Sequence, residues 1–350
     1  MFKSQTTLDS FFTNSSSRKK NDYQIKKYFY LLWENKFKPT VQAYWCIKKP
    51  DKINFIEQIK CDYIKKEHCF YICGYFSDND NQEYKLSKEK IYKNIPYLKS
   101  HLQKNIRKQD DIRAIPTCYH LLKLDINELI RRLPIIMIED TFLHESFTTL
   151  IWLMIALSTK KFKIKKYIYE WILGIVYVLC KINEKDSLNS TEYNKSNLLL
   201  NIDILNNYND LNETQISLLY SMHLRISYGG LKEDLEMINS FIKLWEYRFR
   251  NNLQNVNKIE IKPISIYIKE LNLDDWDLCA IDYHCNSKFL EYISKKYEHI
   301  NIDELKNIIW NNSSSINSRE KVKNIKNKKI WNEIKDHVVK TQKYLLNLSY

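Results

Sequence analysis

The sequence predicts a mainly α fold: a helical bundle with a small α+β unit near its N-terminus and a disordered N-terminal tail. Gly and Pro are scarce, four and six of 350 residues, which favours helices joined by short connections. Apolar residues recur at three- and four-residue steps through residues 97–182, the spacing of amphipathic helices. Aromatic and β-branched residues gather between Tyr23 and Phe76, a composition typical of strands.

Five segments follow from these patterns. Residues 1–22 are polar and rich in Ser and Thr, which predicts the disordered tail. Residues 23–98 form the α+β unit, with strands at VQAYWCI and HCFYICGYF, and residues 99–182 form a helical domain. The Asn-rich stretch 183–212 is predicted to be a linker or long surface loop, and residues 213–350 a mostly helical C-terminal domain.

Local signals refine three of these segments. Asp125 and Asp140 stand near expected helix starts, where an aspartate can cap the free N–H groups. Pro134 should end or kink the helix that contains it. Residues 259–271 (IEIKPISIYIKEL) fit a strand or a helix, and both assignments stay open.

Charge and cysteine usage bound the environment of the protein. The net charge of +13 attracts polyanions, nucleic acid first. Eight scattered Cys residues, in a chain too large to need a disulfide framework, indicate a reducing compartment. The longest apolar run, Phe147–Leu157, is about half a membrane-spanning helix, and the first 20 residues lack the apolar core of a signal peptide. We expect a protein of the nucleus or of a viral replication site, with no membrane partner.

The tail carries a spaced apolar motif at Gln5, Leu8, Phe11 and Phe12. Leu8 and Phe11 share one side of a 3₁₀ turn and form a hydrophobic plug with Phe12, while the Gln5 amide can both donate and accept hydrogen bonds. This pattern resembles the PIP box, the peptide by which replication and repair proteins bind the sliding clamp PCNA. The alternative is that Leu8 and the two Phe residues pack on the fold as a terminal anchor.

A second resemblance covers residues 102–157. The stretch LQKNIRKQD (102–110), the pair Arg131-Arg132, and Glu139-Asp140 at a step of eight are similar to the helical C-terminal region of the replication-associated recombination protein A family, clamp-loader-like AAA+ ATPases. In that family the region is a collar that holds subunits together, which implies a homo-oligomer or a replisome subunit. The sequence has no G-x-x-x-x-G-K-[ST] loop, so no ATPase and no cofactor is expected.

The paired arginines have a structural interpretation as well. Arg131 or Arg132 is expected to form an ion pair with Glu139 or Asp140 across the bend at Pro134. A direct role in DNA binding or catalysis is the alternative.

Two basic segments predict contacts with DNA. Lys104, Arg107 and Lys108 lie in one, and Lys160 and Lys161 in the other. Lys and Arg neutralise phosphates while nearby aromatic rings stack on bases, which suits single-stranded or forked DNA. The alternative is a solvated helix face in a Lys-rich chain.

Metal and catalytic motifs are weak. His68, Cys69 and Cys73 are of zinc-ligand type, with Cys61 upstream, but their spacing is not that of a zinc site, so no metal is predicted. Asp282, His284 and Cys285 form a polar cluster, yet adjacent side chains point apart and cannot activate each other. No catalytic residue is assigned.

These observations predict a PCNA-tethered accessory protein of DNA replication or repair. Its basic helical body would bind DNA or replisome subunits, and it would not be an enzyme. The alternative is a clamp-tethered DNA-processing enzyme, such as a nuclease, with its site around Asp282 and His284.

Overall fold

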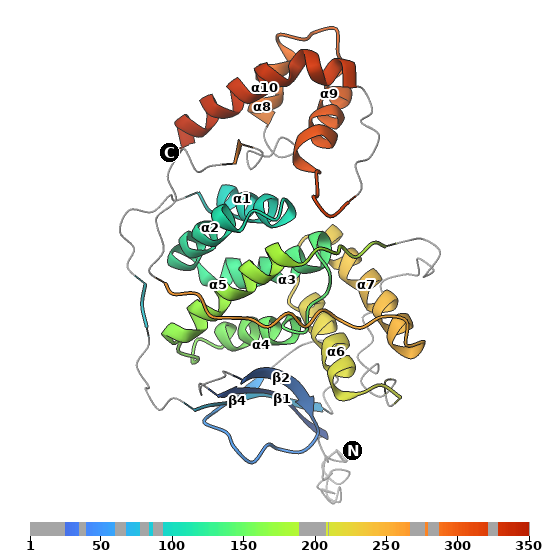
Figure 1. Cartoon of the computed structure of the whole chain (residues 1–350). Coiled ribbons are helices and arrows are strands. Elements are labelled where there is room, and N and C mark those ends of the chain that lie inside the picture. Colours follow the sequence, from blue (N-terminus) through green and yellow to red (C-terminus); the bar gives the residue numbers. More distant parts are fainter. Residues whose placement is uncertain are drawn as a thin grey trace, which may run out of the picture.

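The computed structural model confirms the mainly α fold (Figure 1). Ten α-helices and a four-stranded sheet lie within the described part of the chain. The structure describes residues 25–34, 40–59, 68–77, 84–86, 94–188, 208, 210–266, 277–278, 287–320 and 328–349. The elements are β1 (Ile25–Glu34), β2 (Thr40–Cys46), β3 (Phe55–Ile59), β4 (His68–Phe76), α1 (Ile95–Arg107), α2 (Asp111–Leu124), α3 (Ile126–Asp140), α4 (Phe147–Ser158), α5 (Lys166–Lys181), α6 (Glu213–Ser227), α7 (Lys232–Arg250), α8 (Ser287–Ser294), α9 (Ile302–Ile309), the π-helical turn η5 (Trp310–Ser314) and α10 (Lys328–Ser349).

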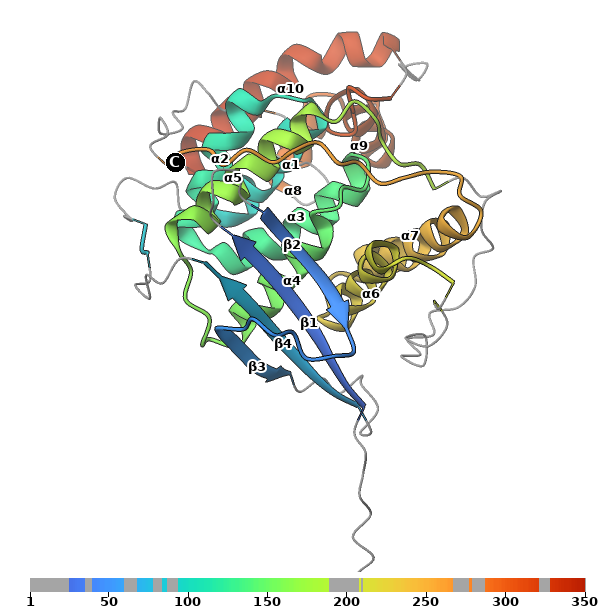
Figure 2. The ribbon, with the colours of Figure 1, turned by 60° about the horizontal axis from the view of Figure 1, so that its bottom comes forward.

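The sheet has the strand order β2-β1-β4-β3, with β1 and β4 parallel and the two outer pairs antiparallel. Because β2 and β3 lie at opposite edges, the connection 47–54 must cross β1 and β4. Figure 2 shows it passing in front of the sheet face that the helices leave open. This crossing carries Lys48, Lys49 and Lys52, all exposed, over that outer face.

Alternation along β1 gives the sheet its two faces. Phe29, Leu31 and Trp33 point to the helices, while Tyr28 and Tyr30 belong to a separate cluster on the outer face. The α4 residue Trp152 joins helix and sheet: its indole Nε1 lies 3.0 Å from the carbonyl oxygens of both Phe29 and Cys73.

Sheet and helices share one hydrophobic core. The cluster that contains Phe29 of β1 and Trp152 of α4 continues through α7 and into the C-terminal helices. The predicted α+β unit is therefore a layer of the same body, covered by α4 and α6, and not a separate domain (Figure 1).

Several local predictions can be compared with the structure. Asp125 caps α3 by accepting the N–H groups of Asn127 and Glu128, as expected. Asp140 is the last residue of α3, so its N-cap assignment is wrong. Pro134 does not end α3, which continues to Asp140.

The predicted linker 183–212 is packed on the body where it is described. Asp186 is buried and accepts hydrogen bonds from Arg248 at 2.5 Å and from the Trp245 indole at 3.1 Å. Tyr208 is buried as well. These contacts make both ends of the stretch part of the core, which corrects the surface-loop prediction for them.

The ambiguous segment 259–266 is neither helix nor strand and runs against α5. The Ile264 N–H donates to the Glu170 carbonyl at 2.9 Å. Gly174 makes this approach possible, because a Cβ there would collide with the carbonyl oxygen of Lys262. No helix in the described ranges has both the length and the apolar character needed to span a bilayer.

Gly174→Ala should lower the free energy of unfolding by about 1–3 kcal/mol, since the added methyl group meets rigid backbone. Gly229→Asn is the matched control: that backbone has φ +72°, which Asn tolerates, and a Cβ would meet no atom within 4 Å. Denaturant unfolding of both variants checks this. Equal losses at the two positions would contradict the close approach at Gly174.

Candidate functional sites: a buried polar junction, a tyrosine face and an acidic pocket

A buried polar junction forms where α1 and α3 end. Arg107 is 4% exposed, and its Nε lies 2.6 Å from Asp140 Oδ1, its Nη2 3.3 Å from Glu139 Oε1 and its Nη1 2.7 Å from the Ser314 carbonyl. A guanidinium used in this way cannot also neutralise a phosphate. The predicted DNA contact at Arg107 is therefore wrong.

The neighbouring lysines are also drawn into contacts within the protein. Lys104 is 4% exposed, and its Nζ lies 5.2 Å above the centre of the Trp310 ring. Lys108 forms an ion pair with Asp277 at 2.6 Å. Lys104, Arg107 and Lys108 thus do not form the exposed basic face that the sequence predicts, because the C-terminal segment covers it. Lys160 and Lys161 remain exposed, although Lys161 pairs with Glu57 at 2.7 Å.

The predicted ion pairs at the paired arginines are present in part. Arg132 lies 3.7 Å from Glu139 and 3.3 Å from Asp234. Arg131 instead donates to the Tyr228 carbonyl at 3.1 Å, and Asp140 pairs with Arg107. Three helices, α1, α3 and α7, are thereby joined through charged side chains.

One further arginine, Arg319, completes the junction. Its guanidinium donates to carbonyl groups at the carboxyl ends of α1, α3 and α5, at distances from 2.5 to 3.3 Å. A cation at the negative end of a helix dipole is stabilising, and here one cation serves three helices. The accepting carbonyls belong to Ile106, Arg107, Asp140, Leu179 and Ile182.

Electrostatics support a structural role for this junction. Burial raises the pKa of Glu139, and the Asp140 charge raises it further, while Arg107 and Arg132 oppose both effects. Burial lowers the pKa of the Arg319 guanidinium. Because charged groups here are engaged with one another or with backbone carbonyls, the junction holds elements together and offers no reactive group.

The outer face of the sheet carries a cluster of tyrosines, the tyrosine face. Tyr28 stacks on Tyr71 with ring centres 5.5 Å apart, and Tyr30 meets Tyr44 edge-on at 5.4 Å. Lys52 Nζ lies 5.7 Å from the centre of the Tyr75 ring. Tyr44, Tyr71 and Tyr75 are half-buried, whereas Tyr28 and Tyr30 are buried.

The titration of this face leaves it uncharged near neutral pH. Burial, and next the neighbouring Tyr44, raise the pKa of Tyr30 to about 12. Burial raises the pKa of Tyr44 as well. Neutral phenol rings beside exposed lysines suit stacking with bases and contact with phosphates.

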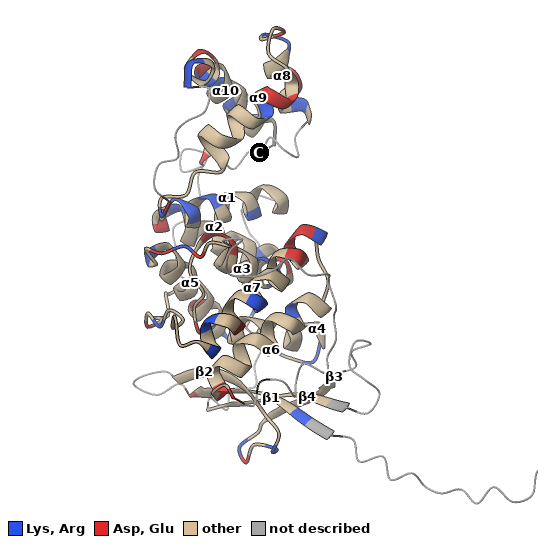
Figure 3. Ribbon diagram, turned by 90° about the vertical axis from the view of Figure 1, so that its right-hand side faces the viewer, with Lys and Arg blue, Asp and Glu red and all other residues tan. Residues whose placement is uncertain are grey.

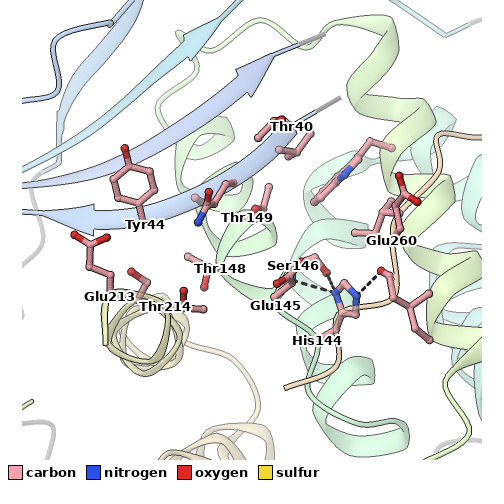
Figure 4. A pocket seen from close by; sticks show the side chains of 17 residues that line it. Thr40, Tyr44, His144, Glu145, Ser146, Thr148, Thr149, Glu213, Thr214 and Glu260 are labelled. Carbon is pink, nitrogen blue, oxygen red and sulfur yellow. Dashed lines mark hydrogen bonds between the residues drawn. The ribbon is translucent and has the colours of Figure 1, made fainter. Parts of the chain in front are cut away.

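A pocket of about 380 Å³, the size of a ligand site, opens beside the edge strand β2. Figure 4 shows Glu213 and Tyr44 on one side of it and Glu260 on the other. Its lining contains three glutamates, several hydroxyl groups and no Lys or Arg. The lining residues are Thr40, Val41, Gln42, Ala43, Tyr44, His144, Glu145, Ser146, Thr148, Thr149, Trp171, Glu213, Thr214, Ser217, Ile259, Glu260 and Ile261.

His144 fixes the wall of this pocket (Figure 4). Its Nδ1 accepts the Ser146 N–H at 3.1 Å, so Nε2 carries the proton and donates to the Ile259 carbonyl at 2.9 Å. The Ser146 hydroxyl can then donate to Nδ1 at 2.8 Å. Burial lowers the pKa of His144, which keeps the ring neutral near pH 7. The pair shapes the turn before α4 and holds segment 257–260 beside it.

Sequence reasoning missed both the tyrosine face and the pocket. The alternation of Tyr28 and Tyr30 with Phe29 and Leu31 was a local signal for the face. The pocket had no such signal, since its lining comes from β2, α4, α5, α6 and segment 259–261, which are distant in sequence.

The motif at Gln5, Leu8, Phe11 and Phe12 and the cluster at Asp282, His284 and Cys285 lie outside the described residues. Within the described ranges, no group of three His, Cys, Asp or Glu side chains could hold a metal ion. No protein-family model, curated protein or solved structure matches this chain.

Arg319→Ala should cost at least about 3 kcal/mol of unfolding free energy, because several buried carbonyls lose their donor together. Arg319→Lys should restore only part of this, since an ammonium cannot reproduce the planar fork. Arg250→Ala is the control: Arg250 pairs at the surface with Glu246 and Asp210, and should cost under about 1 kcal/mol. Thermal and urea unfolding decide, and equal effects at Arg319 and Arg250 would remove the junction from its central place.

Proposed function

We propose that this protein is an accessory factor of DNA replication or repair that is tethered to the sliding clamp and binds single-stranded DNA. The spacing of Gln5, Leu8, Phe11 and Phe12 carries the proposal. Two aromatic residues and one aliphatic residue on a single turn form a compact anchor, the kind of side-chain set that dominates binding energy at interfaces.

The position of the motif along the chain supports tethering. Residues 13–24 separate it from Ile25, where β1 begins. At about 3.3–3.6 Å per residue, twelve residues span at most about 40 Å. The folded body can therefore reach DNA that passes through a clamp while the motif stays bound.

The DNA-binding part of the proposal moves from α1 to the tyrosine face. Lys104 and Arg107 are buried, whereas Lys48, Lys49 and Lys52 are exposed beside half-buried tyrosines. Rings that stack on bases, with cations within reach of the backbone, bind single strands with little sequence preference.

A second exposed basic surface lies on α10, where Figure 3 shows several Lys and Arg segments. Five of its lysines are exposed, against two acidic residues on the same helix that are also exposed. It can extend the path of a bound strand by phosphate contacts alone. The five are Lys328, Lys329, Lys335, Lys340 and Lys343.

The tail is tested by Phe11→Ala combined with Phe12→Ala in the full chain. Loss of both aromatic plugs should cost at least about 3 kcal/mol, more than a hundredfold in affinity for PCNA by calorimetry. Phe2→Ala, an aromatic change in the same tail outside the motif, should leave the affinity unchanged. If the double variant binds as tightly as the parent, the tethering proposal fails.

The tyrosine face is tested by Tyr71→Ala and Tyr75→Ala, read out by fluorescence anisotropy with labelled oligothymidine. Each should weaken binding about 5- to 150-fold, equal to the 1–3 kcal/mol of one stacked base. Tyr71→Phe and Tyr75→Phe should bind like the parent, since they keep the ring. Tyr177→Ala, on α5 beside Lys181, is the control for loss of an exposed tyrosine. Equal weakening by the Phe and Ala variants would contradict stacking.

A further inference from the structure

The pocket lies along a sheet edge that still has hydrogen-bonding capacity. The Trp45 N–H points away from β1 and donates to Ser217 Oγ at 3.0 Å. Backbone groups alternate sides along a strand, so those of Val41 and Ala43 point the same way as those of Trp45. Among the described residues, no hydrogen bond to the backbone of Val41 or Ala43 occupies this outer side.

The charge around this edge is opposite to that of the whole protein. Glu145, Glu213 and Glu260 come from three separate segments and are all exposed at the pocket. Within the described part of the chain, none of them forms an ion pair with a basic side chain. An acidic pocket on a protein of net charge +13 selects a cationic ligand and repels nucleic acid.

We propose that the edge of β2 binds an extended segment of a partner protein that carries Lys or Arg, and that this segment adds a fifth strand to the sheet. Main-chain bonds to Val41 and Ala43 supply affinity, and the three glutamates select basic side chains. Five consecutive residues of β2, Thr40–Tyr44, line the pocket. At about 3.3 Å per residue they offer about 16 Å, room for a short strand.

This arrangement favours a peptide over a small organic cation. A small cation needs only the carboxylates, whereas here a run of strand backbone lies between Glu213 and Glu260 (Figure 4). An extended chain can satisfy both sets of groups at once.

The test uses the full chain and a peptide of about ten residues that alternates Lys and Val, long enough for one strand. Hydrogen exchange of the segment 40–46 is measured with and without the peptide. Strand addition should slow exchange at Val41 and Ala43 at least about tenfold, the effect of about 1.4 kcal/mol of protection. The same peptide with Glu in place of Lys should give no protection.

Two kinds of variant separate the backbone from the charges. Ala43→Pro removes an outward N–H, and since that group does not face β1, the ladder to β1 remains. Glu213→Lys with Glu260→Lys reverses the charge without touching the strand. Each should lower peptide affinity at least about tenfold. Glu236→Lys, an exposed change on α7, should have no effect.

The outcomes are distinct. Protection by the Lys peptide that is lost in both kinds of variant supports strand addition. Equal binding of arginine amide, with no protection of β2, would show a small-cation site and overturn the proposal. Absence of binding, protection at other segments, or self-association that protects β2 without peptide would overturn it as well. If Ala43→Pro fails to fold, the charge-reversed variant still decides.

Discussion

The convergence of three helix carboxyl ends on Arg319 is the constraint on which the helical body depends. Each helix end leaves carbonyl groups that need donors, and stacking three such ends in the interior would otherwise be costly. Arg319 supplies donors to all three, and its own segment thereby becomes fixed to the body. Arg107 adds a second tie, since it reaches both Asp140 and the Ser314 carbonyl.

This constraint explains what could and could not be predicted from the sequence. Helical spacing is local, so the mainly α class and the cap at Asp125 followed from short-range patterns. The fate of Lys104 and Arg107 did not, because it is decided by a partner far along the chain: Ser314 is 207 residues from Arg107. A basic stretch with helical spacing therefore suggested a surface that the C-terminal segment covers.

The sheet concentrates the surfaces that remain available for partners. Its inner face is buried under α4 and α6, its outer face presents tyrosines and lysines, and its β2 edge opens on an acidic pocket. Two surfaces of opposite charge on one small sheet can bind a nucleic acid and a basic protein segment without competition. The tail motif precedes β1, so the clamp contact would lie next to the same sheet.

The central claim is that one chain binds the clamp and single-stranded DNA at the same time. The most direct measurement is the affinity of the full chain for a primed template with a single-stranded overhang, with and without PCNA loaded on the primer. Tethering should raise the apparent affinity at least about a hundredfold through the increased effective concentration, with no change in the intrinsic DNA affinity. An affinity for the primed template that is the same with and without the loaded clamp would contradict the account.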